Sequence, residues 1–524
     1  MSGNPPSSLT SEDPFESSPQ IESERRSRGS RGALGAGAIA TCVVSVLLMV
    51  TLGLLGPSST EPVFGPAGKL PPWFWNAHPP DLLVCALVAL MLLLGTAAVT
   101  AGLVAVRSGW SPSPRALLIG SGFAVAGLLC VPPLGTTDPL NYAAYGRMAA
   151  LGLDPYRISP WRLAHSGDPI GKLAIAEPWL HLPSVYGPLA TATEWAASMV
   201  GGTSMLRTVW LLSVLSGIAY VATGALLLRL AGPDPARRVR SQLLWSLNPV
   251  LLWNLVAGSH VDVLGAFCVV AAFWALRRSG LTAGLALGAA TAIKLTMGVF
   301  ALPFAWSLRH DWRRLAATAS AGILTAAVAF AIAPQVVHNA AQVSGQAVVG
   351  SPWPALLRKV LLPVFGTGAA KLTTAMEVTS ASVLVILMLV MLPPALDSDI
   401  TQRAARPALA LAAGYLLGTS YVRPWYDAAA WLLLALLVPS WFDLVLLAHT
   451  VLMTLTFGPG LPYPLHPHWL TTLIVQIGYR IVPALQALLL LALFVIGIRR
   501  IRRKHFDRPR RLLRDMDDQN LPPT

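Results

Sequence analysis

The chain has 524 residues, of which 54% are hydrophobic and 12% are charged, and its formal net charge is +14. Soluble domains carry about 25% charged residues, so this composition excludes an ordinary soluble protein and indicates one that lipid largely covers. The basic residues stand mostly at the ends of apolar runs and in the tail RRIRRKHFDRPRRLLR. That pattern favours anchoring at a cytoplasmic membrane face over nucleic-acid binding.

The N-terminal segment, residues 1–32, is rich in Ser, Pro, Glu and Arg and almost free of apolar residues. Such a composition predicts a disordered tail. Its basic end, RRSRGSR, abuts the first apolar run and places the N-terminus in the cytoplasm. That run begins near Ala33 and is long enough to span a bilayer, so we expect a retained helix rather than a cleaved signal.

Apolar runs of about 17–25 residues, the length that crosses a bilayer, recur throughout residues 33–498. They lack the alternation of β-barrel strands, and backbone groups in lipid must pair internally, so they predict helices. With arginine-rich connections assigned to the cytoplasm, we expect an all-α polytopic membrane domain of about 14 spans that ends in a basic cytoplasmic tail, residues 499–524. The expected spans lie at about 33–55, 82–105, 116–134, 205–231, 241–257, 263–277, 281–307 as a hairpin, 316–334, 374–395 and 407–440 as a hairpin, with two more before the tail.

The longest polar segment, residues 135–204, follows the third expected span and falls outside the membrane, as a large extracytoplasmic and candidate catalytic loop. Within it, VYGPLATATEWAASMV (185–200) is apolar enough to enter the bilayer. A full span there would place the basic sequence PDPARRVR outside, against the distribution of charge. We therefore expect residues 185–200 to be re-entrant or interfacial.

This topology brings four separate motifs to the outer face: TTDPLNYAAYGR (136–147), SHVD (259–262), IKLT (293–296) and YVRPWYD (421–427). Ionisable side chains near a membrane are costly and tend to be functional or paired. Their gathering on one face of a chain with so few charges indicates a functional site.

Asp138 is the candidate proton acceptor of this site. It follows an apolar span, and partial removal of a carboxylate from water raises its pKa and suits it to take a proton from a hydroxyl. Asp followed by Pro is equally typical of a helix start, so an N-cap role stays open. Tyr142, Tyr145 and Tyr186 can stack on sugar rings or simply pack the loop.

His260 and Asp262 at an expected hairpin tip could bind acceptor hydroxyls or cap a helix. Two such residues do not make a metal site, the cysteines Cys42, Cys85, Cys130 and Cys268 have no ligand spacing, and we predict no metal ligands. A need for a divalent metal in solution stays open, and no cofactor is expected.

Two cations are candidates for binding a phosphate. Lys294 could hold an anion as a point charge or extend its amine to the membrane surface. Arg423, beside Trp425 and Tyr426, offers a bidentate fork, although an interfacial aromatic anchor with an Arg423–Asp427 pair is the alternative.

No GxxxxGK[ST] loop and no soluble nucleotide-binding glycine motif occurs, which argues against an ATP-driven pump core. A nucleotide-sugar donor would be used on the inner face, whereas the candidate residues lie on the outer one. The sequence therefore favours a donor that a lipid already carries.

The motifs, taken in order, resemble a known family. The run TTDPLNYAAYGRMAALGLDPYRISP, then SVYGPLA, NPVLLWNLVAGSHVD, AIKLTMGVFALPF and VRPWYD, is similar to the actinobacterial polyprenyl-phosphate-mannose-dependent α-(1→6)-mannosyltransferases over roughly residues 80–480. The resemblance implies the GT-C class of multi-span glycosyltransferases in the plasma membrane. It also implies a polyprenyl-phosphate-sugar donor and a glycolipid or mannan acceptor, as in lipomannan synthesis.

The resemblance further implies roles for single residues. Asp138 matches the acidic residue of the first large outer loop, the general base, while Lys294, Arg423 and Arg147 become donor phosphate ligands. Sugar or acceptor contacts fall to Tyr142, Tyr145, Tyr186, His260, Asp262, Trp425 and Tyr426. The family block usually reads His-Asn-Asp or His-Asn-Glu, and Val261 stands here in place of the Asn.

Three alternatives stay open at this stage. The same machinery could transfer another lipid-linked sugar such as arabinofuranose. A transporter or flippase would place its key charges near the bilayer midplane, often with inverted repeats, and the sequence indicates neither. A non-catalytic membrane scaffold would have no need for Asp138.

Overall fold

The computed structural model describes residues 19–344, 350–394, 399–459 and 464–519, which form helices joined by loops, with a single β-bridge between Ser58 and Glu61. This confirms the all-α class. The first half of the chain contains α1 Pro19–Leu55, α2 Asp81–Arg107, α3 Pro114–Leu129, α4 Asp138–Ala150, α5 Pro160–Ala164, α6 Pro169–Ala174, α7 Pro188–Gly201, α8 Met205–Leu230, α9 Pro235–Leu244, α10 Pro249–Leu251 and η1 Leu252–Ala257. The second half contains α11 Asp262–Leu276, α12 Gly280–Ile293, η2 Leu295–Phe300, α13 Ala301–Leu308, α14 Trp312–Ile332, α15 Gln335–Ser344, α16 Pro352–Leu356, η3 Leu357–Leu361, α17 Leu362–Phe365, η4 Gly366–Gly368, α18 Ala369–Met391, α19 Ile400–Gly418, η5 Pro424–Asp427, α20 Ala428–Leu436, α21 Phe442–Leu455, α22 His468–Gln476, η6 Ile477–Ile481 and α23 Val482–Gln519.

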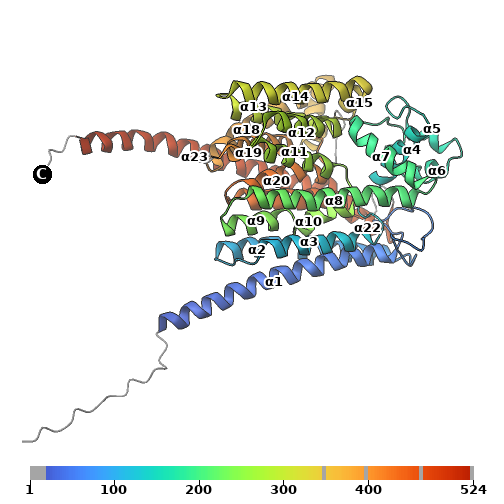
Figure 1. Cartoon of the computed structure of the whole chain (residues 1–524), viewed down its shortest axis with the longest axis horizontal. Coiled ribbons are helices and arrows are strands. Elements are labelled where there is room, and N and C mark those ends of the chain that lie inside the picture. Colours follow the sequence, from blue (N-terminus) through green and yellow to red (C-terminus); the bar gives the residue numbers. More distant parts are fainter. Residues whose placement is uncertain (1–18, 345–349, 395–398, 460–463, 520–524) are drawn as a thin grey trace, which may run out of the picture.

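The long helices lie side by side with their axes roughly aligned (Figure 1). The short helices α4 to α7 gather at one end of this bundle, which we call the short-helix end. The N-terminal part of α1 and the C-terminal part of α23 leave the bundle at the opposite end, which we call the terminal end (Figure 1). The segment expected to form the large outer loop therefore lies opposite the two chain ends.

Among the described residues, six helical segments are long and apolar enough to cross a membrane: Gly32–Leu55, Asp81–Arg107, Met205–Leu230, Trp312–Ile332, Pro352–Met391 and His468–Arg502. Five shorter apolar helices accompany them in the same part of the chain: Pro114–Leu129, Asp262–Leu276, Gly280–Ile293, Leu295–Leu308 and Phe442–Leu455. The structure thus confirms a helical protein with several candidate spans, and the number of about 14 stays a prediction.

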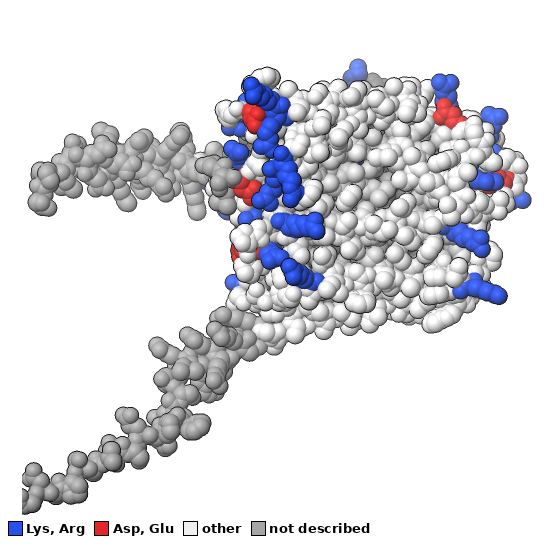
Figure 2. Space-filling model, in the orientation of Figure 1, with Lys and Arg blue, Asp and Glu red and all other residues white. Residues whose placement is uncertain are grey.

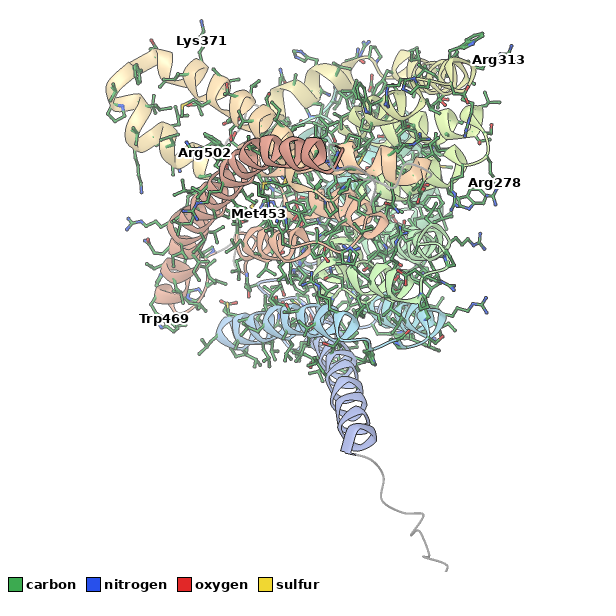
Figure 3. The ribbon with its side chains drawn as sticks, turned by 90° about the vertical axis from the view of Figure 1, so that its left-hand side faces the viewer. Arg278, Arg313, Lys371, Met453, Trp469 and Arg502 are labelled. Atoms are coloured by element: carbon green, nitrogen blue, oxygen red, sulfur yellow. The ribbon has the colours of Figure 1, made fainter. Side chains whose placement is uncertain are left out.

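The charged side chains are distributed as a bilayer requires. Figure 2 shows Lys and Arg mostly at the two ends of the bundle, with a band between them that is almost free of charge. At the terminal end, Arg278 and Arg313 project outward from the rim (Figure 3). Along α14, Ile323 and Ile332 are 69% and 76% exposed, so an apolar environment must cover this face.

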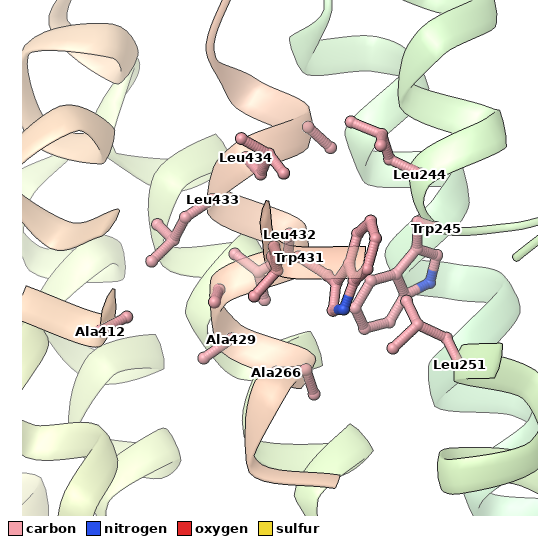
Figure 4. Close-up of a cluster of buried hydrophobic side chains, with 14 of the residues drawn as sticks. Leu244, Trp245, Leu251, Ala266, Ala412, Ala429, Trp431, Leu432, Leu433 and Leu434 are labelled. Atoms are coloured by element: carbon pink, nitrogen blue, oxygen red, sulfur yellow. The ribbon is translucent and has the colours of Figure 1, made fainter. Parts of the chain in front are cut away.

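Buried apolar side chains fill the centre of the bundle and fix the segment that precedes them. All nine residues of α20 are buried, and Trp431 packs near Trp245 of the α9–α10 connection (Figure 4). The indole nitrogen of Trp431 donates to Thr450 Oγ1 of α21 at 2.9 Å. Because η5 leads directly into α20, this packing also sets the position of the YVRPWYD motif.

The two predicted tails are only partly described. Helix α1 begins at Pro19, so residues 19–32, which the sequence predicts to be disordered, are helical; residues 1–18 lie outside the described residues. At the other end, α23 extends through most of 499–524 to Gln519, and residues 520–524 lie outside. Helix α7 covers most of 185–200 and has 14 residues, about 21 Å, too short for a full span.

Candidate functional site

Helix α4 presents the first set of candidate residues on one face. Pro139 occupies its first turn, where a missing N–H costs nothing, and Thr137 is the N-cap. Asp138 is therefore the first residue of the helix and not its cap, and its backbone N–H donates to Thr136 Oγ1 at 3.1 Å. The spacing of Asp138, Tyr142 and Tyr145 places all three side chains on the side of α4 that lines a pocket.

A tyrosine hydroxyl lies at the centre of the polar contacts. Tyr142 Oη is 3.4 Å from Asp138 Oδ2, 3.2 Å from His260 Nδ1 and 3.4 Å from Tyr186 Oη. His260 Nδ1 is also 3.5 Å from Asp138 Oδ2. Four residues from three segments of the chain are thus joined in one buried network.

The SHVD motif meets the YVRPWYD motif through ring stacking. The His260 imidazole lies parallel to the Trp425 indole, with centroids 3.7 Å apart and an interplanar angle of 16°. Ser259 supports this turn with φ +49°, a backbone conformation that non-glycine residues seldom adopt. His260 is therefore part of the packed site and not a surface side chain.

Lys294 does not extend to the surface. Its Nζ lies 2.5 Å from Asp262 Oδ1 and 3.4 Å from the centroid of the Tyr426 ring, and its side chain is 12% exposed. Asp262 is 1% exposed, and its Oδ2 has no hydrogen-bond partner among the residues that the structure describes. The pair is therefore buried but incompletely satisfied.

Arg423 is surrounded by aromatic rings. Its guanidinium carbon lies 4.9 Å from the Phe457 centroid, 5.2 Å from that of Trp179 and 5.5 Å from that of Tyr421. Within the described part of the chain, no carboxylate oxygen lies within 4.0 Å of its nitrogens. The alternative Arg423–Asp427 pair does not form, because Asp427 accepts from Thr450 Oγ1 at 2.5 Å and faces His449 Nε2 at 3.5 Å.

Two pockets meet at these residues. The polar pocket encloses about 480 Å³, its open mouth included, and is lined by Asp138, Tyr142, Tyr145, Tyr186, Arg423 and Trp425 among others. The apolar pocket encloses about 730 Å³ between α11, η2, α19 and α20, with Asp262 and Lys294 in its wall. Tyr426 lines both pockets and stands between them.

Arg147 lies apart from both pockets. Its Nε donates to Asp168 Oδ2 at 2.8 Å, and the same carboxylate caps α6 by accepting from the N–H groups of Ile170 and Gly171. The predicted phosphate-binding role of Arg147 is therefore not supported by its position, which joins α4 to α6.

Burial raises the pKa of Asp138 to about 6, although Arg423 acts in the opposite direction. The carboxylate is therefore largely ionised at neutral pH and close to the range in which a general base works best. Within the described residues, no group of three or more His, Cys, Asp and Glu side chains is placed to hold a metal ion.

Two further residues of this region, Glu177 and Trp179, are not among the candidates that the sequence predicts. Glu177 is 3% exposed, and burial, followed by the charge of Asp138, raises its pKa to about 8. Trp179 lines the polar pocket beneath Arg423. Both belong to the stretch AEPWL, in which the only local signal is an acidic residue and a Trp beside Pro178.

Comparison with known proteins places the chain among membrane sugar transferases. Residues 36–310 match the family described as α-(1→6)-mannopyranosyltransferase, N-terminal domain. An α-(1→6)-mannopyranosyltransferase B of Corynebacterium glutamicum is 32% identical over 152 residues, 28% of this chain and 25% of that protein. An α-(1→6)-mannopyranosyltransferase A of Mycobacterium tuberculosis is 32% identical over 201 residues, 36% of each chain.

A second Mycobacterium tuberculosis protein with an α-(1→6)-mannopyranosyltransferase name is 32% identical over 145 residues, 26% of this chain and 23% of its own. The matches thus span about a quarter to a third of the length of these relatives. No solved structure matches the chain.

Proposed function

The chain belongs to the α-(1→6)-mannopyranosyltransferase family, and from this premise we propose that it is a membrane glycosyltransferase that uses polyprenyl-phosphate-mannose. It transfers the mannose to a lipid-anchored mannan and forms α-(1→6) linkages, as in lipomannan synthesis. The site faces the outside of the plasma membrane, and both termini are cytoplasmic.

The observation that carries the proposal is the junction of the two pockets at Tyr426. A polyprenyl phosphate needs an apolar cavity for its chain and a cation beside its phosphate. The apolar pocket takes the part of the polyprenyl chain nearest the phosphate, and the Lys294 ammonium lies at its wall. The sugar then enters the polar pocket, which contains Asp138 and Arg423.

In the proposed reaction, the Asp138 carboxylate removes the proton from the acceptor 6-hydroxyl while the hydroxyl oxygen attacks C1 of the mannose. The bond between C1 and the phosphate oxygen breaks on the opposite face, so a β-linked donor gives an α-linked product. The proton stays on Asp138, and the polyprenyl phosphate leaves with the bonding electrons. One unit of negative charge therefore moves from Asp138 to the phosphate.

The cations of the site suit that movement of charge. Arg423 has no carboxylate partner in the described structure, so it can bind a phosphate without first breaking an ion pair. Lys294 must share its charge between Asp262 and the phosphate. Fixed cations aimed at the leaving group stabilise the transition state more than the ground state.

The remaining residues hold the sugar and keep the base in place. Tyr142 and His260 contact the Asp138 carboxylate and fix its orientation. Tyr186 donates to Tyr142 and lines the polar pocket with Tyr145 and Trp425, where ring faces and hydroxyls suit a pyranose. These contacts predict orienting roles rather than proton transfer.

Transfer by membranes that contain the full-length protein tests the proposal. Radiolabelled polyprenyl-phosphate-mannose and a short α-(1→6)-mannoside are supplied to wild type, Asp138→Asn and Asp154→Asn at equal protein levels. We expect Asp138→Asn to lower kcat about 10²–10⁴-fold, because the amide cannot accept the proton. Asp154 is a matched control on the same outer segment, since its side chain is 43% exposed and pairs with Arg157.

Equal transfer by wild type and Asp138→Asn would overturn the base assignment. Transfer by wild type from polyprenyl-phosphate-arabinofuranose, with none from the mannose donor, would change the sugar and leave the mechanism standing.

A further inference from the structure

A separate pocket opens at the terminal end of the bundle, where α8 and α11 end side by side. It encloses about 870 Å³, its open mouth included, and is lined by Arg229 from the last turn of α8 and by Trp274, Arg277 and Arg278 from the end of α11. We call it the arginine pocket. Its lining shares no residue with the polar pocket or the apolar pocket.

The positive charge of the arginine pocket is not neutralised by acidic side chains. Within the described part of the chain, none of its three arginines has a carboxylate oxygen within 4.0 Å. On the neighbouring turn before α14, Asp311 is already engaged, because it accepts from the backbone N–H of Arg314 and lies 3.9 Å from Arg314 Nε. All three arginines are exposed, so a ligand can reach their guanidinium groups.

An aromatic ring orients one of these cations. The guanidinium carbon of Arg278 lies 4.0 Å from the centroid of the Trp274 ring. A guanidinium stacked on a ring keeps its planar fork of N–H groups, which matches two oxygens of a phosphate. Arg278 projects from the rim of the terminal end (Figure 3), and Trp side chains are typical of the boundary between lipid and water. The pocket therefore lies at the level of lipid headgroups.

Exposed apolar side chains lead up to the arginine pocket. On α8, Ile218 is exposed and precedes Arg229 by 11 residues, about three turns, so both side chains lie on one face of the helix. On α12, which packs against α11, Leu281 and Leu285 are exposed just beyond Arg278. Figure 2 shows basic side chains of the terminal end directly beside the uncharged band. A ligand with a negative headgroup and apolar chains would be matched at both of its parts.

We propose that the arginine pocket binds the headgroup of an anionic phospholipid in the leaflet at the terminal end. The phosphodiester accepts from the three guanidinium groups, and the acyl chains cover the exposed apolar side chains of α8 and α12. Basic residues at the membrane surface attract anionic headgroups, and each one adds to the affinity. A free phosphate would meet the same cations but would leave the apolar surface uncovered. The site has no part in sugar transfer, so it stands independently of the proposed function.

The test counts the lipids that the full-length protein retains in dodecyl maltoside, by native mass spectrometry. Phosphatidylglycerol and phosphatidylcholine with the same acyl chains are supplied in parallel. We expect wild type to retain one more phosphatidylglycerol than Arg229→Gln/Arg277→Gln/Arg278→Gln, since each arginine contributes roughly fivefold in affinity. The two proteins should retain phosphatidylcholine equally. Because all three side chains are exposed, the variant should fold as wild type does.

The matched control is Arg115→Gln/Arg309→Gln/Arg313→Gln, which removes the same charge from exposed arginines outside the pocket and should retain phosphatidylglycerol as wild type does. An equal phosphatidylglycerol count in wild type and the pocket variant would overturn the site. The same loss in the control variant would overturn it too, because it would reflect net charge alone. Displacement of the lipid by an excess of inorganic phosphate would assign the pocket to free phosphate and overturn the lipid assignment.

Discussion

Two buried ion pairs in this protein differ in how completely they are satisfied. Arg240 of α9 binds Asp443 of α21 through two contacts of 2.6 and 2.9 Å, and it also donates to the carbonyls of Leu434 and Leu437. Lys294 meets Asp262 through one contact of 2.5 Å, and within the described ranges Asp262 Oδ2 has no hydrogen-bond partner. Both acids are 1% exposed, so burial alone does not separate them.

The difference indicates two purposes. The Arg240–Asp443 pair joins three segments of the chain. Both carboxylate oxygens of Asp443 accept from Arg240, as expected of a contact that fixes the fold. The Lys294–Asp262 pair borders the apolar pocket, and only one carboxylate oxygen of Asp262 contacts the ammonium. The Lys294 ammonium can therefore bind a second anion in place of Asp262. On the proposed function, that second anion is the donor phosphate.

The largest expected effect concerns the Arg240 pair. Arg240→Met removes both close contacts of the buried Asp443 and leaves it only Arg107 Nη2 at 3.9 Å, so the free energy of unfolding should fall by about 3–5 kcal/mol at most. Unfolding in detergent measures the loss, and transfer per folded molecule should stay within about twofold of wild type. The double variant Arg240→Met/Asp443→Leu should regain part of the stability. Loss of transfer activity in this double variant would contradict a purely structural role for the Arg240–Asp443 pair.

The Lys294 pair should behave in the opposite way. In Lys294→Met/Asp262→Leu the ion pair is replaced by apolar side chains, so stability should stay close to that of wild type. The value of kcat/KM for the donor should fall roughly 100-fold, because a cation beside the leaving phosphate is lost. Transfer kinetics at varied donor concentration measure this, and wild-type activity in the double variant would assign Lys294 a structural role.

The dependence of kcat/KM on pH tests the role of Asp138, the carboxylate that lies near these cations. Since the pKa of Asp138 is raised to about 6, the base is ionised above that value and protonated below it. We expect kcat/KM to be nearly constant from pH 7 upward and to approach a tenfold fall per pH unit well below 6. Glu177→Gln should keep this inflection, whereas a flat profile between pH 7 and 5 would contradict the assignment.

The smallest effect is expected at Arg147, the third predicted phosphate ligand. Because its guanidinium binds Asp168 away from the pockets, Arg147→Gln should cost about 1 kcal/mol of stability at most. Its kcat/KM for the donor should stay within about twofold of wild type. A fall in kcat/KM as large as that of Lys294→Met/Asp262→Leu would instead support a role for Arg147 in binding the donor phosphate.

The sequence predicted the helical class because apolar run length depends only on local composition. It also predicted much of one wall of the site, since Asp138, Tyr142 and Tyr145 are separated by whole turns of one helix. The family followed from the order of the motifs, and the comparisons confirm it.

Other features required the tertiary structure. The stacking of His260 on Trp425 joins residues far apart in the chain, and no local pattern records it. The same is true of the partner of Lys294. Glu61 and Glu177 lie in polar loops that look solvent-exposed in sequence, and their burial depends on how those loops fold back over the bundle.

The position of Tyr426 affects how the two products leave the site. Its side chain lines both the apolar pocket and the polar pocket, so this one residue separates the two. On the proposed function, the spent isoprenoid would return to the membrane through the apolar pocket after transfer, and the lengthened glycan would leave through the polar pocket. Neither product then has to cross the path by which the other leaves.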